Sequence, residues 1–268
     1  MTLREKIATG PVARAAALPT RVSIVARYDA RVLADSVRWL LLSREHTNFT
    51  YDLEPRNVEH LAWFVAAVAN VPVTAIRGYL GELESDGSLR EHLERRAALS
   101  PRRGLVDRRV RYGRRAGWYA LVRALRPEHV VETGTDKGLG TCVLAAAMLK
   151  NERGRVTTID TSGAAGSLLA GAYAGVVDLL TGDSVALLPS LDPVDFFIHD
   201  SLHTPEHEVA ELDAAPLTGD AIALSDNAHV TGVLAGWAER TDRHFLYFQE
   251  RPRDHWYPGA GIGAAWRR

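Results

Sequence analysis

The sequence predicts an α/β protein with a Rossmann-like, seven-stranded and mostly parallel sheet, a C-terminal antiparallel hairpin and a helical N-terminal region. Three observations support this prediction. Strand-like and helix-like segments alternate after residue 116, which is typical of a parallel sheet covered by helices. A glycine-rich turn at residues 134–140 joins the first strand to an apolar helix. Only a loop with Pro and Gly separates the last two strands, which indicates an antiparallel pair at one edge.

The composition is that of an ordinary soluble globular protein, with 46% hydrophobic and 24% charged residues among 268. The net charge of −1 creates no field that would attract nucleic acid or an anionic membrane. No apolar run reaches the ~18 residues of a membrane span, and no signal peptide is recognisable. Cys142, the single cysteine, excludes an internal disulfide. We therefore expect a cytoplasmic protein without nucleic-acid or membrane partners.

Residues 1–115 are expected to form a helical region that acts as a lid, a substrate site or a dimer interface. Pro11 and Pro19 are expected to break any long helix near the N-terminus. Ser88 is the expected N-cap of the last helix. Apolar spacing predicts helices at 30–42, 58–71, 73–84 and 89–99.

The segment 101–115 contains seven arginines and one acid. A solvated linker is the favoured interpretation, and a patch for a phosphorylated or nucleic-acid partner is the alternative. The net charge of the chain and the lack of interleaved aromatic residues speak against the patch.

Residues 116–268 are expected to form the second domain, which begins with a helix at 116–125. Helical segments separate the first five predicted strands and also precede the sixth. The strands are predicted at 129–134, 155–161, 176–182, 194–200, 221–227, 244–250 and 261–266.

The glycines of the turn, Gly134, Gly138 and Gly140, follow the order G-x-x-x-G-x-G. A dinucleotide-binding turn has G-x-G-x-x-G instead. Glu132, two residues before the first glycine, would repel a pyrophosphate but would suit a cationic amino acid. Asp160 ends the next strand, where an acid can accept hydrogen bonds from a ribose diol. These features indicate a nucleoside ligand that carries an amino-acid group.

This set resembles the class I methyltransferases that use S-adenosylmethionine (SAM), over residues 116–268. The segment 182–184 ends the third strand, where the resemblance implies the adenine edge. Without a cofactor, the glycines would merely permit a tight turn and Asp160 would cap a helix. The resemblance implies that the cofactor-binding residues are Glu132, Gly134, Thr135, Gly138, Gly140, Asp160, Gly182, Asp183, Ser184 and Asp200.

A second group of polar residues follows the fourth and fifth strands. Asp200 ends one strand, and Asp226 and Asn227 end the next. The carboxyl ends of parallel strands meet at one sheet edge, so these oxygens should converge. Buried like charges repel unless a cation lies between them, and oxygen ligands suit Mg²⁺. The sequence therefore predicts a divalent-cation site.

This second group resembles the metal-dependent O-methyltransferases of the catechol O-methyltransferase type. The resemblance implies that Asp200, Asp226 and Asn227 bind Mg²⁺ and that His203 is the catalytic base. The type enzyme has a lysine at the position of His203, which makes the assignment of the base less firm. The implied acceptor is a small molecule with a hydroxyl, with vicinal oxygens as one option. A role in natural-product or secondary metabolism is implied by the resemblance alone.

Other interpretations stay open at this point. Asp200 and Asp226 could cap strand ends in a metal-independent N- or O-methyltransferase. The chain could also be a SAM-binding regulatory protein without turnover. His199 is expected to pack at a strand end, and Glu206 and His207 are expected to face solvent. Residues 46–52 and Tyr112 could form a lid or pocket for the substrate. The aromatic residues of the loop 251–260 could either cover the substrate or pack the loop against the protein.

Overall fold

The computed structural model describes residues 11–46, 49–101, 103–107 and 109–267. By their contacts, the residues form two compact units. One unit contains the chain up to Ser43 together with Asp254–Tyr257, and the other contains Arg44–Arg253 and Pro258–Arg268. The expected division at residue 115 stays a prediction, and the structural units differ from it.

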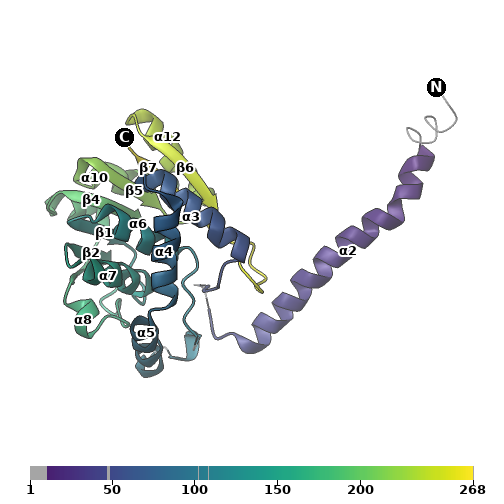
Figure 1. Ribbon diagram of the computed structural model, residues 1–268, viewed down its shortest axis with the longest axis horizontal. Helices are drawn as coiled ribbons and strands as arrows, with labels where there is room; N and C mark the ends of the chain where they lie inside the picture. The colour runs from purple at the N-terminus through teal and green to yellow at the C-terminus, as the bar shows by residue number, and fades with distance from the viewer. Residues whose placement is uncertain (1–10, 47–48, 102, 108, 268) are drawn as a thin grey trace. The chain divides into compact units, whose positions relative to one another are not determined.

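The larger unit is built on a seven-stranded sheet with the order β3-β2-β1-β4-β5-β7-β6 (Figure 1). β1 to β5 pair in parallel, and β7 runs antiparallel to β5 and β6. This arrangement confirms the predicted fold class and the terminal hairpin. The strands are β1 His129–Thr133, β2 Arg155–Asp160, β3 Val177–Thr181, β4 Val194–His199, β5 Leu217–Ser225, β6 His244–Gln249 and β7 Gly261–Trp266.

Helices that precede the first strand in the sequence, as well as helices between the strands, cover this sheet (Figure 1). α6 packs on α7, α3 and α4 pack on α6, and α10 packs on α12. The longer helices are α3 Pro55–Ala69, α4 Val73–Glu84, α5 Gly87–Leu99, α6 Arg115–Leu125, α7 Leu139–Asn151, α10 Pro205–Ala214 and α12 Val233–Arg240. The shorter ones are η1 Arg103–Leu105, α8 Gly171–Ala174, α9 Ser184–Leu187, η2 Leu188–Ser190 and α11 Ala228–Thr231.

Strand alternation decides which side chains enter the core. Val131, Phe197 and Ala223 lie side by side in register on β1, β4 and β5. They share a buried apolar cluster with Leu212 of α10 and Trp237 of α12. Successive strand residues point to opposite faces. Glu132, the neighbour of Val131, therefore faces the side of the sheet where α6 and α7 lie.

Two expectations for the helical region are wrong. α2 Pro11–Leu42 continues through Pro19, because one lost hydrogen bond does not end a helix whose flanking turns both continue. The N-cap of α5 is Asp86, whose side chain accepts the backbone N–H of Leu89, and not Ser88. None of the helices within the described residues is long and apolar enough to cross a membrane.

Candidate active site

The turn after β1 lies against the end of β4. Gly134 has φ +90°, and a Cβ atom there would overlap the carbonyl oxygen of Asp200. The backbone N–H of Asp200 also donates to the carbonyl of Thr133 at 3.0 Å. Gly138, with φ +89°, is the N-cap of α7. The first glycine is therefore required by packing as well as by its backbone angle.

Glu132 is a buried carboxylate beneath this turn. It accepts hydrogen bonds from the hydroxyls of Thr141, at 2.5 Å, and Thr158, at 2.7 Å. Burial raises the pKa of Glu132 to about 7, although both threonine hydrogen bonds act in the opposite direction. A Cβ atom on Gly140 would lie 2.5 Å from Glu132 Oε1 and 2.6 Å from Trp118 Cζ3. Because Gly140 has no side chain, the carboxylate of Glu132 has space beside it.

Two further acids hold the loops that follow β2 and β3. Asp160 accepts the backbone N–H groups of Asp136, at 2.9 Å, and Ser162, at 2.8 Å. Asp183 caps α9 by accepting the N–H of Val185 at 3.1 Å. Both carboxylates thus have structural roles, and each oxygen retains a second lone pair for a ligand.

A cavity of about 750 Å³ lies over the glycine turn and the strand ends. Except for Gly138 and Asp226, every residue predicted for cofactor, metal or base lines it. Its predicted lining residues are Glu132, Gly134, Thr135, Gly140, Asp160, Gly182, Asp183, Ser184, Asp200, His203 and Asn227. The buried carboxylate of Glu132, which lines this cavity, fits a ligand with a cationic amino-acid group, as SAM has.

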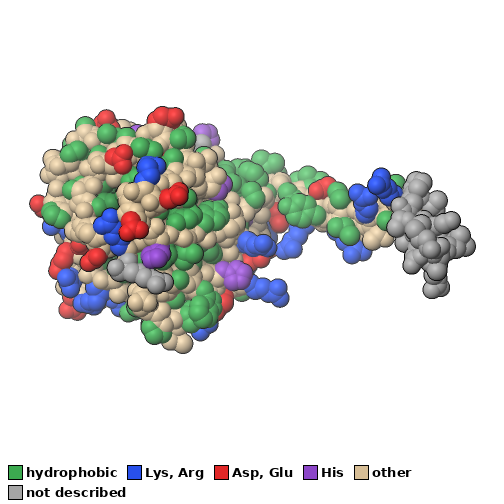
Figure 2. Space-filling view, turned by 90° about the horizontal axis from the view of Figure 1, so that it is seen from above, with side chains coloured by type: hydrophobic (Ala, Val, Ile, Leu, Met, Phe, Trp, Pro, Cys, Tyr) green, Lys and Arg blue, Asp and Glu red, His purple; other side chains and the backbone are tan. Residues whose placement is uncertain are grey.

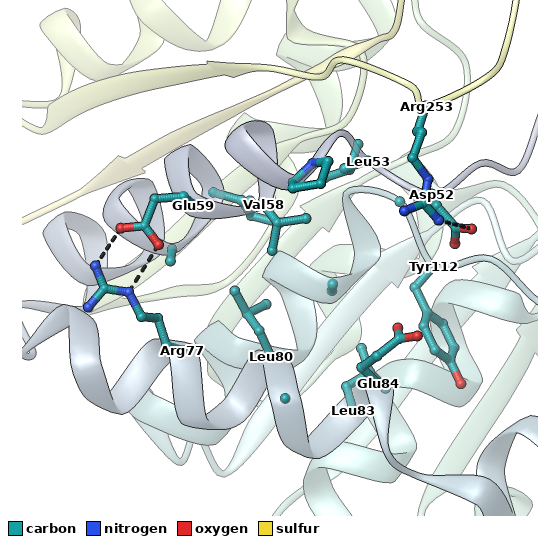
Figure 3. A pocket seen from close by; sticks show the side chains of 16 residues that line it. Asp52, Leu53, Val58, Glu59, Arg77, Leu80, Leu83, Glu84, Tyr112 and Arg253 are labelled. Carbon is teal, nitrogen blue, oxygen red and sulfur yellow. Dashed lines mark hydrogen bonds and ion pairs between the residues drawn. The ribbon is translucent and has the colours of Figure 1, made fainter.

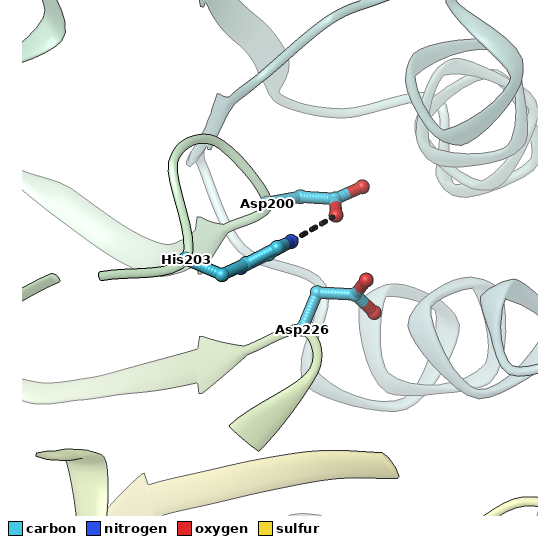
Figure 4. Close-up of side chains that lie close together, drawn as sticks. All are labelled: Asp200, His203 and Asp226. Atoms are coloured by element: carbon cyan, nitrogen blue, oxygen red, sulfur yellow. Dashed lines mark ion pairs between the residues drawn. The ribbon is translucent and has the colours of Figure 1, made fainter. Parts of the chain in front are cut away.

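The strand-end cluster, which we define as Asp200, His203, Asp226 and Asn227, lies at one side of this cavity. Figure 4 shows Asp200, His203 and Asp226 pointing the same way from β4 and β5, and one ligand atom of each lies within 4.8 Å of the others. His203 Nε2 lies 3.8 Å from Asp200 Oδ1 and 2.8 Å from Asn227 Nδ2. Burial lowers the pKa of His203, so its imidazole is neutral near pH 7.

Two arginines from the predicted linker enter the site, which the sequence interpretation missed. Arg114 is buried, and its Nε and Nη2 donate to the two carboxylate oxygens of Asp226. Its Nη1 lies 3.3 Å from Glu250 Oε2. Arg115 Nη2 lies 3.9 Å from Asp200 Oδ2. The expectation that the whole of 101–115 is a solvated linker is therefore wrong for its last two residues.

These contacts bear on the expected magnesium site. The spacing of the strand-end cluster alone would allow an ion. Burial raises the pKa of Asp226, but the Arg114 guanidinium outweighs that effect and brings the pKa down to about 2. Burial and the charge of Asp226 raise the pKa of Asp200 well above its usual range. Because a guanidinium already engages both oxygens of Asp226, the side chains as they lie do not fit a divalent cation.

Comparison with known proteins identifies the domain. Residues 131–217 match the family model described as a methyltransferase domain. This segment of the chain is therefore similar to a methyltransferase domain. The match confirms the resemblance to the class I SAM-dependent methyltransferases that the glycine turn and the sheet predicted. No curated protein matches the sequence.

Two solved structures are examples that share the fold of this chain. One is the O-methyltransferase TomG from Streptomyces achromogenes, which is involved in tomaymycin synthesis and was solved with SAM. It is 22% identical, with a TM-score of 0.52, over 66% of this chain and 89% of that chain. The other is a methyltransferase from Geobacter sulfurreducens, 20% identical with a TM-score of 0.50, over 72% of this chain and 96% of that chain. At these identities the likeness establishes the fold.

Another buried carboxylate, Glu211 of α10, contacts side chains that line the active-site cavity. Burial raises its pKa, but the interactions with His199, Ser184 and Thr133 together outweigh that effect and lower the pKa to about 2. His199 packs at its strand end as expected, and Glu206 is exposed as expected. His207 is half-buried and lines the cavity, so the expectation that it faces solvent is wrong. The side chains in contact with Glu211 are Thr133, Ser184, His199, Ser201 and His207.

A separate cavity of about 410 Å³ lies beside α3 and α4 (Figure 3). Asp52 and Tyr112, expected near the substrate, line this cavity and not the one over the glycine turn. Two residues of the expected segment, 47 and 48, lie outside the described residues. Tyr112 and Gly113 face this cavity, whereas the next two residues line the active-site cavity. One short segment thus forms a wall of both cavities.

Proposed function

We propose that the protein is a SAM-dependent O-methyltransferase that acts on the hydroxyl of a small molecule. The observation that carries the proposal is the shared cavity. It is lined by Gly134 and Asp160 on one side and by His203 and Asn227 on the other. A cofactor held by the first pair would present its reacting group to the second pair.

The residues around the glycine turn would bind the cofactor. Glu132 would accept hydrogen bonds from the ammonium group, since a buried carboxylate is stabilised by a cation. Asp160 would accept from the ribose hydroxyls with its remaining lone pairs. Asp183 and Ser184 would lie along the adenine edge. Bound SAM supplies the methyl group, which passes to the acceptor oxygen as the sulfonium becomes a neutral thioether.

His203 would act as the general base. Its neutral imidazole takes the proton of the acceptor hydroxyl while the oxygen forms its bond to carbon. Asn227 holds the ring through the 2.8 Å contact to Nε2. Nε2 becomes available as the base when the side chain of Asn227 moves away from it as the acceptor binds. Positioned proton transfer of this kind contributes about 10²–10⁴-fold to turnover.

The substitution His203→Ala tests this assignment. Turnover should fall by about 10²–10⁴-fold, while the affinity for SAM, measured by calorimetry, should stay within about twofold. His229→Ala, which removes an exposed histidine of α11, is the matched control and should change neither quantity. Wild-type turnover in the His203 variant would disprove the base, and failure of the wild-type protein to bind SAM would disprove the function.

Two versions of the reaction differ in their need for metal. In the magnesium-dependent version, Asp200, Asp226 and Asn227 would hold the ion, and the acceptor would carry vicinal oxygens. The pairing of Arg114 with Asp226 favours the metal-independent version. A panel of mono- and dihydroxylated acceptors, assayed with and without a chelator, separates the two. A role in natural-product metabolism stays a prediction.

The proposal includes a homodimer formed through α2. Within its own unit this helix leaves apolar side chains exposed, among them Val22, Val25, Leu33 and Leu40. Figure 2 shows apolar and basic side chains along it. Sedimentation of the full chain tests the dimer, because a monomer at micromolar concentration would exclude it. A cytoplasmic location stays a prediction.

A further inference from the structure

Arg114 is held at the centre of a buried chain of charges. Its side chain donates to both oxygens of Asp226, and its Nη1 lies 3.3 Å from Glu250 Oε2. Its backbone N–H also donates to Glu250 Oε1 at 2.9 Å. Tyr51 donates its hydroxyl to Glu250 Oε2 at 2.9 Å. Both carboxylates and the guanidinium are buried, so the position of Arg114 is fixed from several sides.

The position of the guanidinium matters because of what it contacts. Asp226 is buried and follows β5, whereas Asp200 and His203 follow the neighbouring strand β4. The ends of these two strands bring the three side chains close together. A fork of two N–H groups matches the two oxygens of one carboxylate and carries a permanent positive charge. Arg115 places a second guanidinium 3.9 Å from Asp200. Each carboxylate of the expected metal site therefore already has a cationic partner.

We propose that Arg114 is the resident cation of this site and excludes divalent metal from the strand-end cluster. The inference rests on the proposed methyltransferase function. A divalent ion bound to Asp226 would lie close to the guanidinium, and the two positive charges would repel strongly in a buried site. Arg114 therefore acts as a positioning residue that holds the carboxylate of Asp226 in place without a metal.

Metal binding, measured without turnover, tests the inference. With wild-type protein present, the electron paramagnetic resonance signal of free Mn²⁺ should equal the signal of the same Mn²⁺ concentration in buffer, up to about 1 mM. Only binding with a Kd weaker than about 1 mM would escape this measurement. The double variant R114Q/E250Q removes one charge of each sign and leaves the strand-end cluster intact. It should gain one Mn²⁺ site per chain, at least about tenfold tighter than any binding by the wild type.

The chain offers a matched control. Arg123 and Glu82 form a similar pair, with Nε 2.7 Å from Oε1, away from the strand-end cluster. The variant R123Q/E82Q should gain no Mn²⁺ site. If R114Q/E250Q does not fold, the wild-type titration decides alone.

Two results would overturn the inference. One is stoichiometric Mn²⁺ binding by the wild type that D226N abolishes, and the other is a folded R114Q/E250Q variant that gains no site. Calorimetry with SAM on the same wild-type sample separates this failure from failure of the proposed function. A protein that binds SAM and also binds Mn²⁺ keeps the function and refutes only the role of Arg114.

Discussion

The substitution Glu132→Gln is expected to change stability and cofactor affinity in opposite directions. Glu132 is 1% exposed, and burial raises its pKa from an ordinary value of 4.5 to about 7. Each pH unit between those two values corresponds to about 1.4 kcal/mol of folding free energy. The buried carboxylate therefore costs the folded protein about 3 kcal/mol at pH 8.

The sign follows from the direction of the pKa shift. The pKa of Glu132 is higher in the folded protein than in the unfolded chain. Its contribution to stability is therefore complete below pH 4.5 and is lost as the pH rises through about 7. Glutamine does not ionise, so the cofactor-free variant should be more stable than the wild type at pH 8, by up to about 3 kcal/mol. The two proteins should be equally stable near pH 4.5.

Cofactor affinity should fall in the same variant. A hydrogen bond between charged groups contributes about 1.5–3 kcal/mol, so losing it weakens binding roughly 10- to 150-fold. Wild-type affinity for SAM should itself decrease below pH 7 as Glu132 takes up its proton, and the variant should lack this dependence.

Denaturant unfolding without cofactor and calorimetry with SAM, both at pH 6 and pH 8, measure the two effects. Glu206→Gln, an exposed acid on α10, should alter neither. A Glu132→Gln variant that is less stable at pH 8 and binds SAM with unchanged affinity would refute the reasoning.

Two further substitutions probe the same site. Glu211→Gln should destabilise the protein by about 3 kcal/mol at pH 7, because contacts such as that with His199 lower the pKa of Glu211 in the folded protein to about 2. In unfolding experiments, the difference in stability between variant and wild type should shrink as the pH falls from 4.5 to 2. An unchanged unfolding midpoint at pH 7 would contradict this prediction. Gly140→Ala should weaken SAM binding in calorimetry by at least about tenfold, since the new methyl group would lie 2.5 Å from Glu132; wild-type affinity would show that the turn has room to spare.

The sequence predicted the sheet well because its signals are local. All seven strands were expected within a few residues of their observed bounds, except that β5 begins four residues earlier, at Leu217. The residues that line the active-site cavity were also predictable, since in a parallel sheet they follow the carboxyl ends of successive strands. Chain order and strand direction alone therefore bring Glu132, Asp160 and Asp200 to one cavity.

The role of the arginines could not be predicted in this way. Arg114 meets Asp226 and Glu250, which lie 112 and 136 positions away in the sequence. Composition describes 101–115 as a basic stretch and cannot distinguish its buried end from its exposed part. The prediction that Pro19 breaks a long helix was wrong for a similar reason. It took into account the hydrogen bond lost at the proline but not the helical turns on either side of Pro19.

The glycine turn and the strand-end cluster depend on each other through the backbone. The carbonyl of Asp200 occupies the space that a side chain at Gly134 would need. The backbone N–H of Asp200 donates to Thr133, and that of Asp226 donates to His199. Neither site can shift without moving the other, because these contacts join β1 to β4 and β4 to β5. The same packing that forms the glycine turn therefore also fixes the distance from that turn to His203.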